Sequence, residues 1–228
     1  MEVRVCRTVA AILPLMAVLA LVAGCSRMGG STPTEADRRA AIEHFNRGLE
    51  HQAGGQLDLA VEEYSQAIAL DPQFAEAYGN RGRAYYDQGD LDRAIADYDQ
   101  VIALKPEDAQ AYNNRGNAYD NKGDPDRAIV DYDRAIALDL QYVDAYFNRG
   151  LAYYRKGILN RAIADLSRCL EIDASDAIAY YIRGKVFGEM GEREEAVSDL
   201  ETALALGLPP NWEQAAQDLL VELQPQLP

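Results

Sequence analysis

The residues best suited to chemistry in this chain are two histidines and three cysteines. His44 and His51 stand two helical turns apart, and the cysteines are Cys6, Cys25 and Cys169. Nucleophilic catalysis needs a Ser or Cys beside a His, and a zinc site needs His and Cys ligands at short spacings. Neither pattern occurs, and the glycines are spread evenly instead of clustering into a phosphate-binding loop. The sequence therefore predicts no catalytic residue, no metal site and no cofactor.

Charged residues form a second pattern. Arginines recur at one constant interval along the chain, and an acidic residue follows each of them at one constant distance. A guanidinium and a carboxylate can form two parallel hydrogen bonds, so this spacing predicts five partly buried structural ion pairs. The alternative is a solvated charge on each face. The five pairs are Arg47 and Glu63, Arg81 and Asp97, Arg115 and Asp131, Arg149 and Asp165, and Arg183 and Asp199.

The elements that position these pairs repeat with the same period as the arginines. One column holds only glycine, a second holds only alanine, and two more hold mostly tyrosine. Such periodicity is the mark of a repeat protein. The glycine column is Gly48, Gly82, Gly116, Gly150 and Gly184, and the alanine column is Ala60, Ala94, Ala128, Ala162 and Ala196.

Each repeat has the signals of two antiparallel helices. In the third copy Tyr112, Gly116 and Tyr119 recur at helical steps, Gly123 offers a stop, and Asp124 followed by a proline offers a new start. Glycine is unfavourable inside a helix. The glycine column is therefore expected to let the partner helix approach closely at its alanine column.

The column residues resemble the tetratricopeptide repeat (TPR): an aromatic residue, Gly, an aromatic residue, then Ala, Tyr and Pro. The resemblance implies an all-α fold, a right-handed α-solenoid of helix-turn-helix repeats. Because one helix pair cannot bury its apolar face, the array is stabilised by stacking and needs a cap. We expect Asn211 as an N-cap and Trp212 in the packed stripe of a capping helix. The predicted parts are five repeats at 41–74, 75–108, 109–142, 143–176 and 177–210, and the capping helix with its tail at 211–228.

In the TPR family the first helices of successive repeats line a concave groove that receives peptides or helices. By this resemblance the groove of this chain would present aromatic and polar side chains suited to a peptide. For Tyr86 and Tyr154, packing between neighbouring first helices is an equal alternative. The candidate groove residues are Phe45, Arg83, Tyr86, Asn113, Asn117, Asp120, Asn121, Phe147, Tyr154, Arg155 and Tyr181.

Two further columns limit the choice of ligand. The chaperone-binding TPR subset uses a lysine clamp for a C-terminal carboxylate, and its first lysine aligns with Phe45, Gly79, Asn113, Phe147 or Tyr181. None is lysine, so that clamp is not expected. The asparagines Asn46, Asn80, Asn114 and Asn148 suggest a structural or backbone-binding role. Cys169 stands in a column of small apolar residues, which predicts a buried, inert thiol.

Residues 1–25 have the pattern of a secretory signal. Arg4 and Arg7 precede an uncharged run from Val9 to Ala23, and Cys25 follows two small residues. Residues 22–25 resemble a bacterial lipobox, which implies cleavage before Cys25 and lipidation of its thiol. An uncleaved transmembrane anchor is the alternative, although the run is shorter than the roughly 20 residues that a span needs.

Residues 26–40 are rich in Gly, Ser, Thr and Pro at their start and are expected to form a flexible tether. Ser26 after the cysteine favours export to the outer membrane in Gram-negative lipoproteins. The expected location is therefore across the inner membrane, on the periplasmic side of the outer membrane, and held there by the lipid anchor.

The net charge of −15 over 228 residues has the wrong sign for a nucleic-acid-binding protein. Together these features predict a non-enzymatic adaptor that binds protein partners of a bacterial envelope, similar to TPR lipoproteins that assemble envelope machinery. The alternative is a self-associating structural module that stacks end to end.

Overall fold

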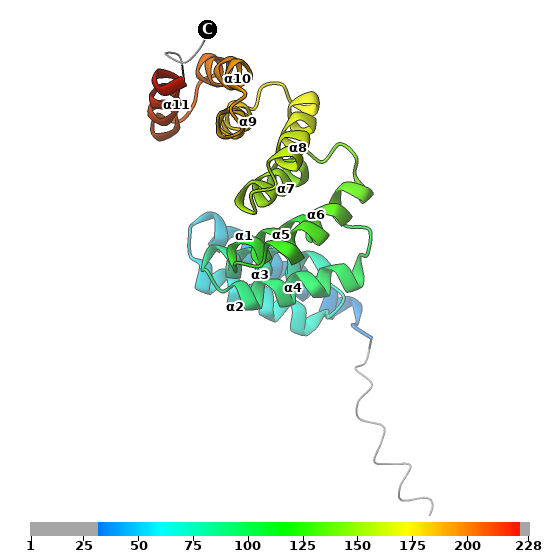
Figure 1. Ribbon diagram of the computed structural model, residues 1–228. Coiled ribbons are helices and arrows are strands. Elements are labelled where there is room, and N and C mark those ends of the chain that lie inside the picture. Colours follow the sequence, from blue (N-terminus) through cyan, green and yellow to red (C-terminus); the bar gives the residue numbers. More distant parts are fainter. Residues whose placement is uncertain (1–31, 224–228) are drawn as a thin grey trace, which may run out of the picture.

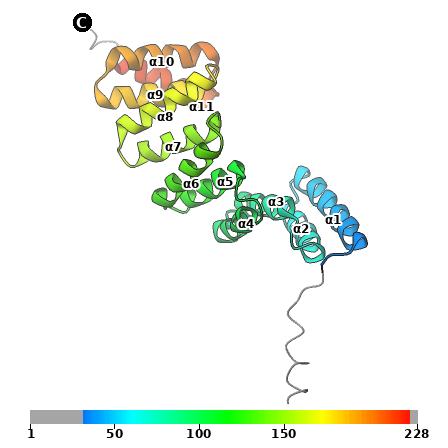
Figure 2. The ribbon, with the colours of Figure 1, turned by 90° about the vertical axis from the view of Figure 1, so that its right-hand side faces the viewer.

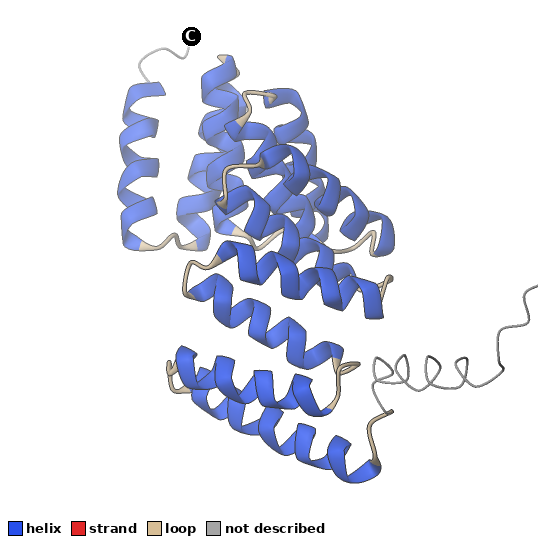
Figure 3. Ribbon diagram, turned by 90° about the horizontal axis from the view of Figure 1, so that it is seen from below, coloured by secondary structure: helices blue, strands red, loops and turns tan. Residues whose placement is uncertain are grey.

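The computed structural model describes residues 32–223, and this part of the chain folds into helices joined by short loops (Figure 1, Figure 3). The predicted signal peptide and Cys25 lie outside these residues. The eleven helices are α1 Glu35–Ala53, α2 Leu57–Leu70, α3 Ala75–Asp87, α4 Leu91–Leu104, α5 Ala109–Asn121, α6 Pro125–Leu138, α7 Val143–Arg155, α8 Leu159–Ile172, α9 Ala177–Met190, α10 Arg193–Leu206 and α11 Pro210–Leu223.

The helices follow one another in chain order from α1 at one end of the array to α11 near the other (Figure 2). Each packs on the helix before it and the helix after it, so α1 to α10 form five helix pairs. First helices of neighbouring repeats also touch one another, at α1 and α3, α3 and α5, and α5 and α7. The all-α TPR solenoid is thereby confirmed, and its first helices share one side of the array.

The turn inside each repeat follows the sequence signals. After α5 the backbone of Gly123 has φ of +84°, a left-handed conformation that favours glycine. The Asp124 side chain then accepts a hydrogen bond from the Arg127 backbone N–H, and Pro125 is the first residue of α6. These contacts end one helix and begin the next within three residues.

The glycine column lies against a different neighbour from the one expected. A Cβ at Gly116 would lie 2.6 Å from Cε1 of Tyr132, and one at Gly48 would lie 2.4 Å from the same atom of Tyr64. In the first three repeats the glycine therefore makes room for a buried tyrosine ring. Only in the last two does backbone of the alanine column come close, with the Ala196 oxygen 3.1 Å from a Cβ at Gly184.

Two boundaries differ from the sequence prediction. Helix α1 begins at Glu35, so the last six residues of the expected tether are helical. The cause is a capping box: the Thr34 hydroxyl accepts from the Asp37 backbone N–H, and the Asp37 carboxylate accepts from the Thr34 backbone N–H. Helix α11 begins at Pro210 instead of after Asn211, and the Pro209 carbonyl accepts the first N–H groups.

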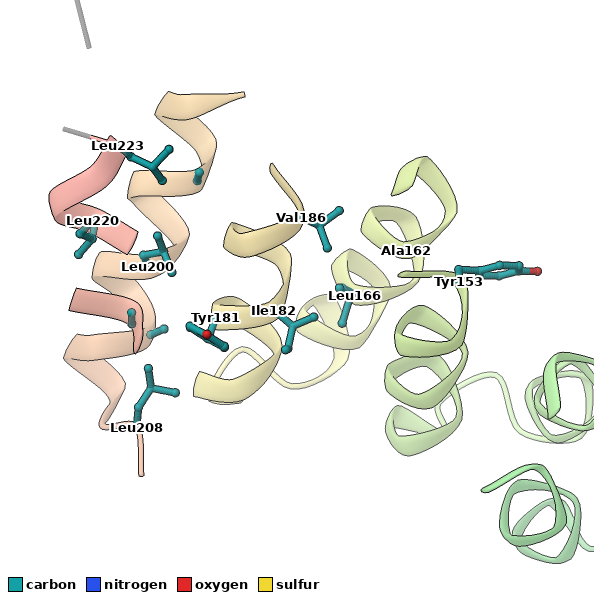
Figure 4. Packing of buried hydrophobic residues seen from close by; sticks show 13 residues of the cluster. Tyr153, Ala162, Leu166, Tyr181, Ile182, Val186, Leu200, Leu208, Leu220 and Leu223 are labelled. Carbon is teal, nitrogen blue, oxygen red and sulfur yellow. The ribbon is translucent and has the colours of Figure 1, made fainter. Parts of the chain in front are cut away.

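Helix α11 covers the end of the array. Ala216, Leu220 and Leu223 are buried against α9 and α10, and Trp212 stacks edge-on against Tyr181 with ring centroids 5.1 Å apart. Figure 4 shows Leu220 and Leu223 beside Leu200 of α10. Among the described residues, no helix has the length and apolar character needed to cross a bilayer.

Candidate protein-binding groove

The arginine column forms a ladder of ion pairs between the two helices of each repeat. Arg115 donates from Nε and Nη2 to the two oxygens of Asp131, at 2.8 and 2.6 Å. The same two-bond geometry joins Arg81 to Asp97, Arg149 to Asp165 and Arg183 to Asp199. The four aspartates are buried, and hydrogen bonding to Asp131 raises the pKa of Arg115 above its ordinary value.

The third nitrogen of each of these arginines reaches back to the preceding repeat. Nη1 of Arg81 donates to the Ser65 hydroxyl, and Nη1 of Arg183 donates to the Ser167 hydroxyl, both at 3.0 Å. Arg115 and Arg149 make the same contact with Asp99 and Asp133. Each arginine thus joins three helices. Sequence reasoning missed this contact, although its acceptors also recur with the period of the repeat.

The first repeat is the exception. Arg47 makes one 3.0 Å bond to Glu63, and the Arg47 side chain is 46% exposed against 20% for Arg115. The Nδ1 atom of His44 lies 2.7 Å from the same Glu63 oxygen that Arg47 contacts. Burial acts to raise the pKa of Glu63, but the bonds from His44 and Arg47 outweigh it and leave that pKa below its usual range. No described helix precedes α1 to supply a third partner.

The histidines and the described cysteine do not meet. His44 and His51 lie on α1, where His51 bonds the Gln56 side chain, whereas Cys169 is fully buried in α8. Burial raises the pKa of the Cys169 thiol to about 12, so this thiol carries no nucleophilic thiolate near neutral pH.

Four of the predicted groove residues take part in packing, and two of them, Asn113 and Tyr181, are buried. Tyr181 is only 8% exposed and lies under Trp212, and Asn113 is 3% exposed with its Oδ1 accepting from Asn148. Phe45 packs on Phe74 with ring centroids 4.9 Å apart, and Phe147 fills the space between two core clusters. All four share one repeat position, which in this structure faces the neighbouring first helix or the core.

Five of the other predicted residues form contacts from one first helix to the next, whereas Arg83 bonds Asp87 on its own helix and Asn117 accepts from Tyr132 of α6. Asn121 donates to the Tyr86 hydroxyl, Arg155 pairs with Asp120, and the Tyr154 hydroxyl donates to Glu189. In each pair the two residues belong to successive repeats. Tyr86 and Tyr154 are half-buried and pack against the core, so the packing role weighed for them is present, and their role in ligand binding stays a prediction. Arg83, Asn121 and Arg155 remain exposed on this face.

A cleft absent from the sequence prediction opens beside these contacts. It has a volume of about 250 Å³ and lies between α3 and α5, with α4 at its base. It continues toward Tyr86 and Asn117 as a second hollow of about 230 Å³, which shares Arg83, Tyr98 and Asn114 with the first. We call both together the α3–α5 cleft. In the sequence, this cleft is marked by Gly79, which stands at the repeat position that Phe45, Asn113, Phe147 and Tyr181 occupy in the other repeats.

Comparison with known proteins assigns the family. A TPR repeat model matches residues 48–89 and 82–123, and tetratricopeptide repeat models match 109–142, 143–176 and 177–206. These matches span most of the chain, which therefore belongs to the TPR family, whose members are protein–protein interaction scaffolds and usually not catalysts. No curated protein matches the chain.

Solved structures give the same fold. A crystal structure of MamA is 30% identical, with 70% of this chain covering 93% of that chain at a TM-score of 0.66. YrrB, described as a TPR protein with an unusual peptide-binding site, is 22% identical over 78% of this chain and 92% of its own, with a TM-score of 0.64. PilW, described as a widely conserved type IV pilus biogenesis factor, is 20% identical over 82% of this chain and 91% of its own, with a TM-score of 0.68.

Proposed function

We propose that this protein is a lipid-anchored scaffold of a bacterial envelope that binds a segment of a partner protein along its first helices. The observation that carries the proposal is the face of α3, α5 and α7, where Arg83 lines the α3–α5 cleft and Asn121 and Arg155 are exposed on the same face. Hydrogen-bonding side chains beside half-buried tyrosines suit a peptide ligand. The descriptions of YrrB and PilW make a peptide ligand and an envelope setting natural starting points for experiments.

A crosslinking pull-down from membranes tests the groove. We would compare the wild-type protein with an Arg83→Ala, Asn121→Ala, Arg155→Ala variant of equal abundance and folding. A matched control carries Gln66→Ala, Gln100→Ala and Val130→Ala, three exposed positions on second helices. Partners lost only from the groove variant support the proposal. Loss only from the control would move binding to the second helices and overturn it.

The lipid anchor is tested separately at Cys25. Cells fed an alkyne-bearing fatty acid should label the wild-type protein and leave a Cys25→Ser variant unlabelled. The labelled protein should fractionate with membranes, because several buried acyl chains, at about 0.8 kcal/mol per CH₂, hold a protein on a bilayer almost permanently. Ser26 after the cysteine makes the outer membrane the expected fraction. Equal labelling of both variants would rule out this anchor.

Self-association is a second candidate function, favoured by apolar residues on the outer faces of the end helices. Ile42 and Leu49 on α1 and Val221 on α11 are exposed, Val221 by 71%. A head-to-tail contact between these ends would build open chains of molecules. Sedimentation velocity over a hundredfold concentration range would reveal growing species if this is correct and a constant monomer if it is not.

A further inference from the structure

Gly79 has no packing role that accounts for it. A Cβ added there would meet only Cγ2 of Val101, at an ordinary contact distance of 3.7 Å. The glycines of the repeat column differ, because a Cβ at any of them would come within 2.4 to 3.2 Å of the facing helix. Glycine inside a helix lowers helix stability relative to alanine. What glycine provides at position 79 is the open space of the cleft.

The corresponding positions of the other repeats are filled. Phe45 and Phe147 place aromatic rings there, Asn113 is buried in a hydrogen bond to Asn148, and Tyr181 is covered by Trp212. The α3–α5 cleft therefore exists because one repeat lacks this side chain. A ligand group entering it would take the place that the chain fills itself elsewhere.

The Tyr98 hydroxyl at the base of the cleft lacks the partner that its equivalents have. Tyr64 donates to Gln52 at 2.7 Å, and Tyr132 donates to Asn117 at 2.8 Å. Tyr98 is only 1% exposed, lines both hollows of the cleft, and has no hydrogen bond to another described residue. Among the described residues, no fully enclosed side-chain oxygen lacks a hydrogen-bond partner, so the Tyr98 hydroxyl opens onto the cleft, where it can donate a hydrogen bond to a ligand.

The second hollow, toward Tyr86 and Asn117, has no carboxylate in its lining, whereas Glu76 and Asp108 line the first. Asn117 already uses its Oδ1 to accept from Tyr132, which leaves its Nδ2 as a donor. Arg83 bonds Asp87 through Nε alone, which leaves the donors of its two Nη atoms. Asn114 adds an amide from the opposite wall. This donor set matches a carboxylate, which only accepts hydrogen bonds.

We propose that the α3–α5 cleft receives a glutamate or aspartate side chain of a peptide segment, with its stem beside Gly79 and Val101 and its carboxylate at Tyr98 and Arg83. The inference rests on the proposed groove function and adds the chemistry of one ligand residue. Because the protein carries a net charge of −15, the residues around this acid in the ligand should be neutral or basic.

Binding of defined peptide pools tests the proposal. The probes are capped, fluorescent octapeptides whose central residue is fixed as Glu, Asp, Gln, Lys, Phe or Ala, with neutral mixtures at the other positions. Fluorescence anisotropy with the full chain in detergent micelles should give at least tenfold tighter binding for the Glu and Asp pools than for Gln and Ala. Gly79→Phe, which copies the other repeats, should abolish this preference. Gly188→Ala is the matched control, a helical glycine whose Cβ would also have 3.7 Å of clearance.

The possible outcomes separate this inference from the proposed function. Pools that bind without any preference for an acid, or with a preference that survives Gly79→Phe, overturn the inference and leave groove binding in place. If no pool binds up to millimolar concentration, both the inference about the acid and the proposed groove function are wrong.

A stability measurement on Gly79→Ala provides an independent test. An alanine without a clash should raise the melting temperature by about 2–4 °C while weakening the Glu pool. A lower melting temperature would mean that Gly79 is needed for packing, and the argument for an open ligand site would fail.

Discussion

At the scale of single residues, the arginine column does more than pair charges. Arg81, Arg115, Arg149 and Arg183 each connect both helices of their own repeat with the second helix of the repeat before. Only arginine offers enough donors in a planar arrangement for this, so lysine would not replace it. The column is thus a structural element between repeats.

Arg115→Ala should lower the free energy of unfolding by about 3–5 kcal/mol, because it leaves the buried Asp131 carboxylate without its counter-charge. Arg47→Ala, which breaks a more exposed pair, should cost under about 1 kcal/mol. Urea unfolding followed by circular dichroism gives both values. Equal, small losses would show that the ladder contributes little to stability.

Cys169 should resist alkylation in the folded protein. With a pKa of about 12, roughly one thiol in ten thousand is ionised at pH 8, and the side chain is fully buried. Iodoacetamide treatment followed by peptide mass spectrometry should leave the Cys169 peptide unmodified until urea is added. Rapid modification without urea would contradict the buried position.

At the scale of helices, glycines at two positions of the first helices have opposite roles. Gly82 and Gly116 allow a tyrosine ring to lie on the helix backbone, whereas Gly79 touches little and leaves a cleft. The difference depends on what the facing helix presents, and substitution by alanine measures it directly.

Gly116→Ala should destabilise the protein by about 1–3 kcal/mol, although alanine favours helices, because its Cβ would overlap the Tyr132 ring. The comparison is Gly79→Ala, expected to stabilise. Thermal unfolding of both variants under one condition provides the measurement. A stabilising Gly116→Ala would mean that the tyrosine can move away at little cost.

At the scale of the whole molecule, the array has two unlike ends. Helix α11 covers the last repeat with Trp212, Leu220 and Leu223, whereas the outer face of α1 carries exposed Ile42 and Leu49. In a linear array each repeat is stabilised mainly by its neighbours. Loss of the cap should therefore act locally.

A chain ending at Leu208 should exchange the amide hydrogens of α9 and α10 much faster, since Tyr181 and Leu200 lose their cover. The amides of α3 to α6 should keep their protection. Hydrogen–deuterium exchange with mass spectrometry resolves the two regions, and Val221→Asp, on the exposed side of α11, is the control. Uniform loss of protection along the chain would contradict a repeat-by-repeat array.

The sequence by itself determined the helix pairs, the period of the repeat and the partners of Arg81, Arg115, Arg149 and Arg183, because these depend on contacts within one repeat that recur in each copy. It did not determine which side chains remain available to a partner. Tyr181 and Asn113 were expected in the groove and are buried, and the cleft at Gly79 was not expected. Those outcomes depend on the distance and angle between successive first helices, which many small inter-repeat contacts set together. Only the tertiary structure brings Tyr98 and Gly79 into one cleft and places Tyr181 beneath Trp212.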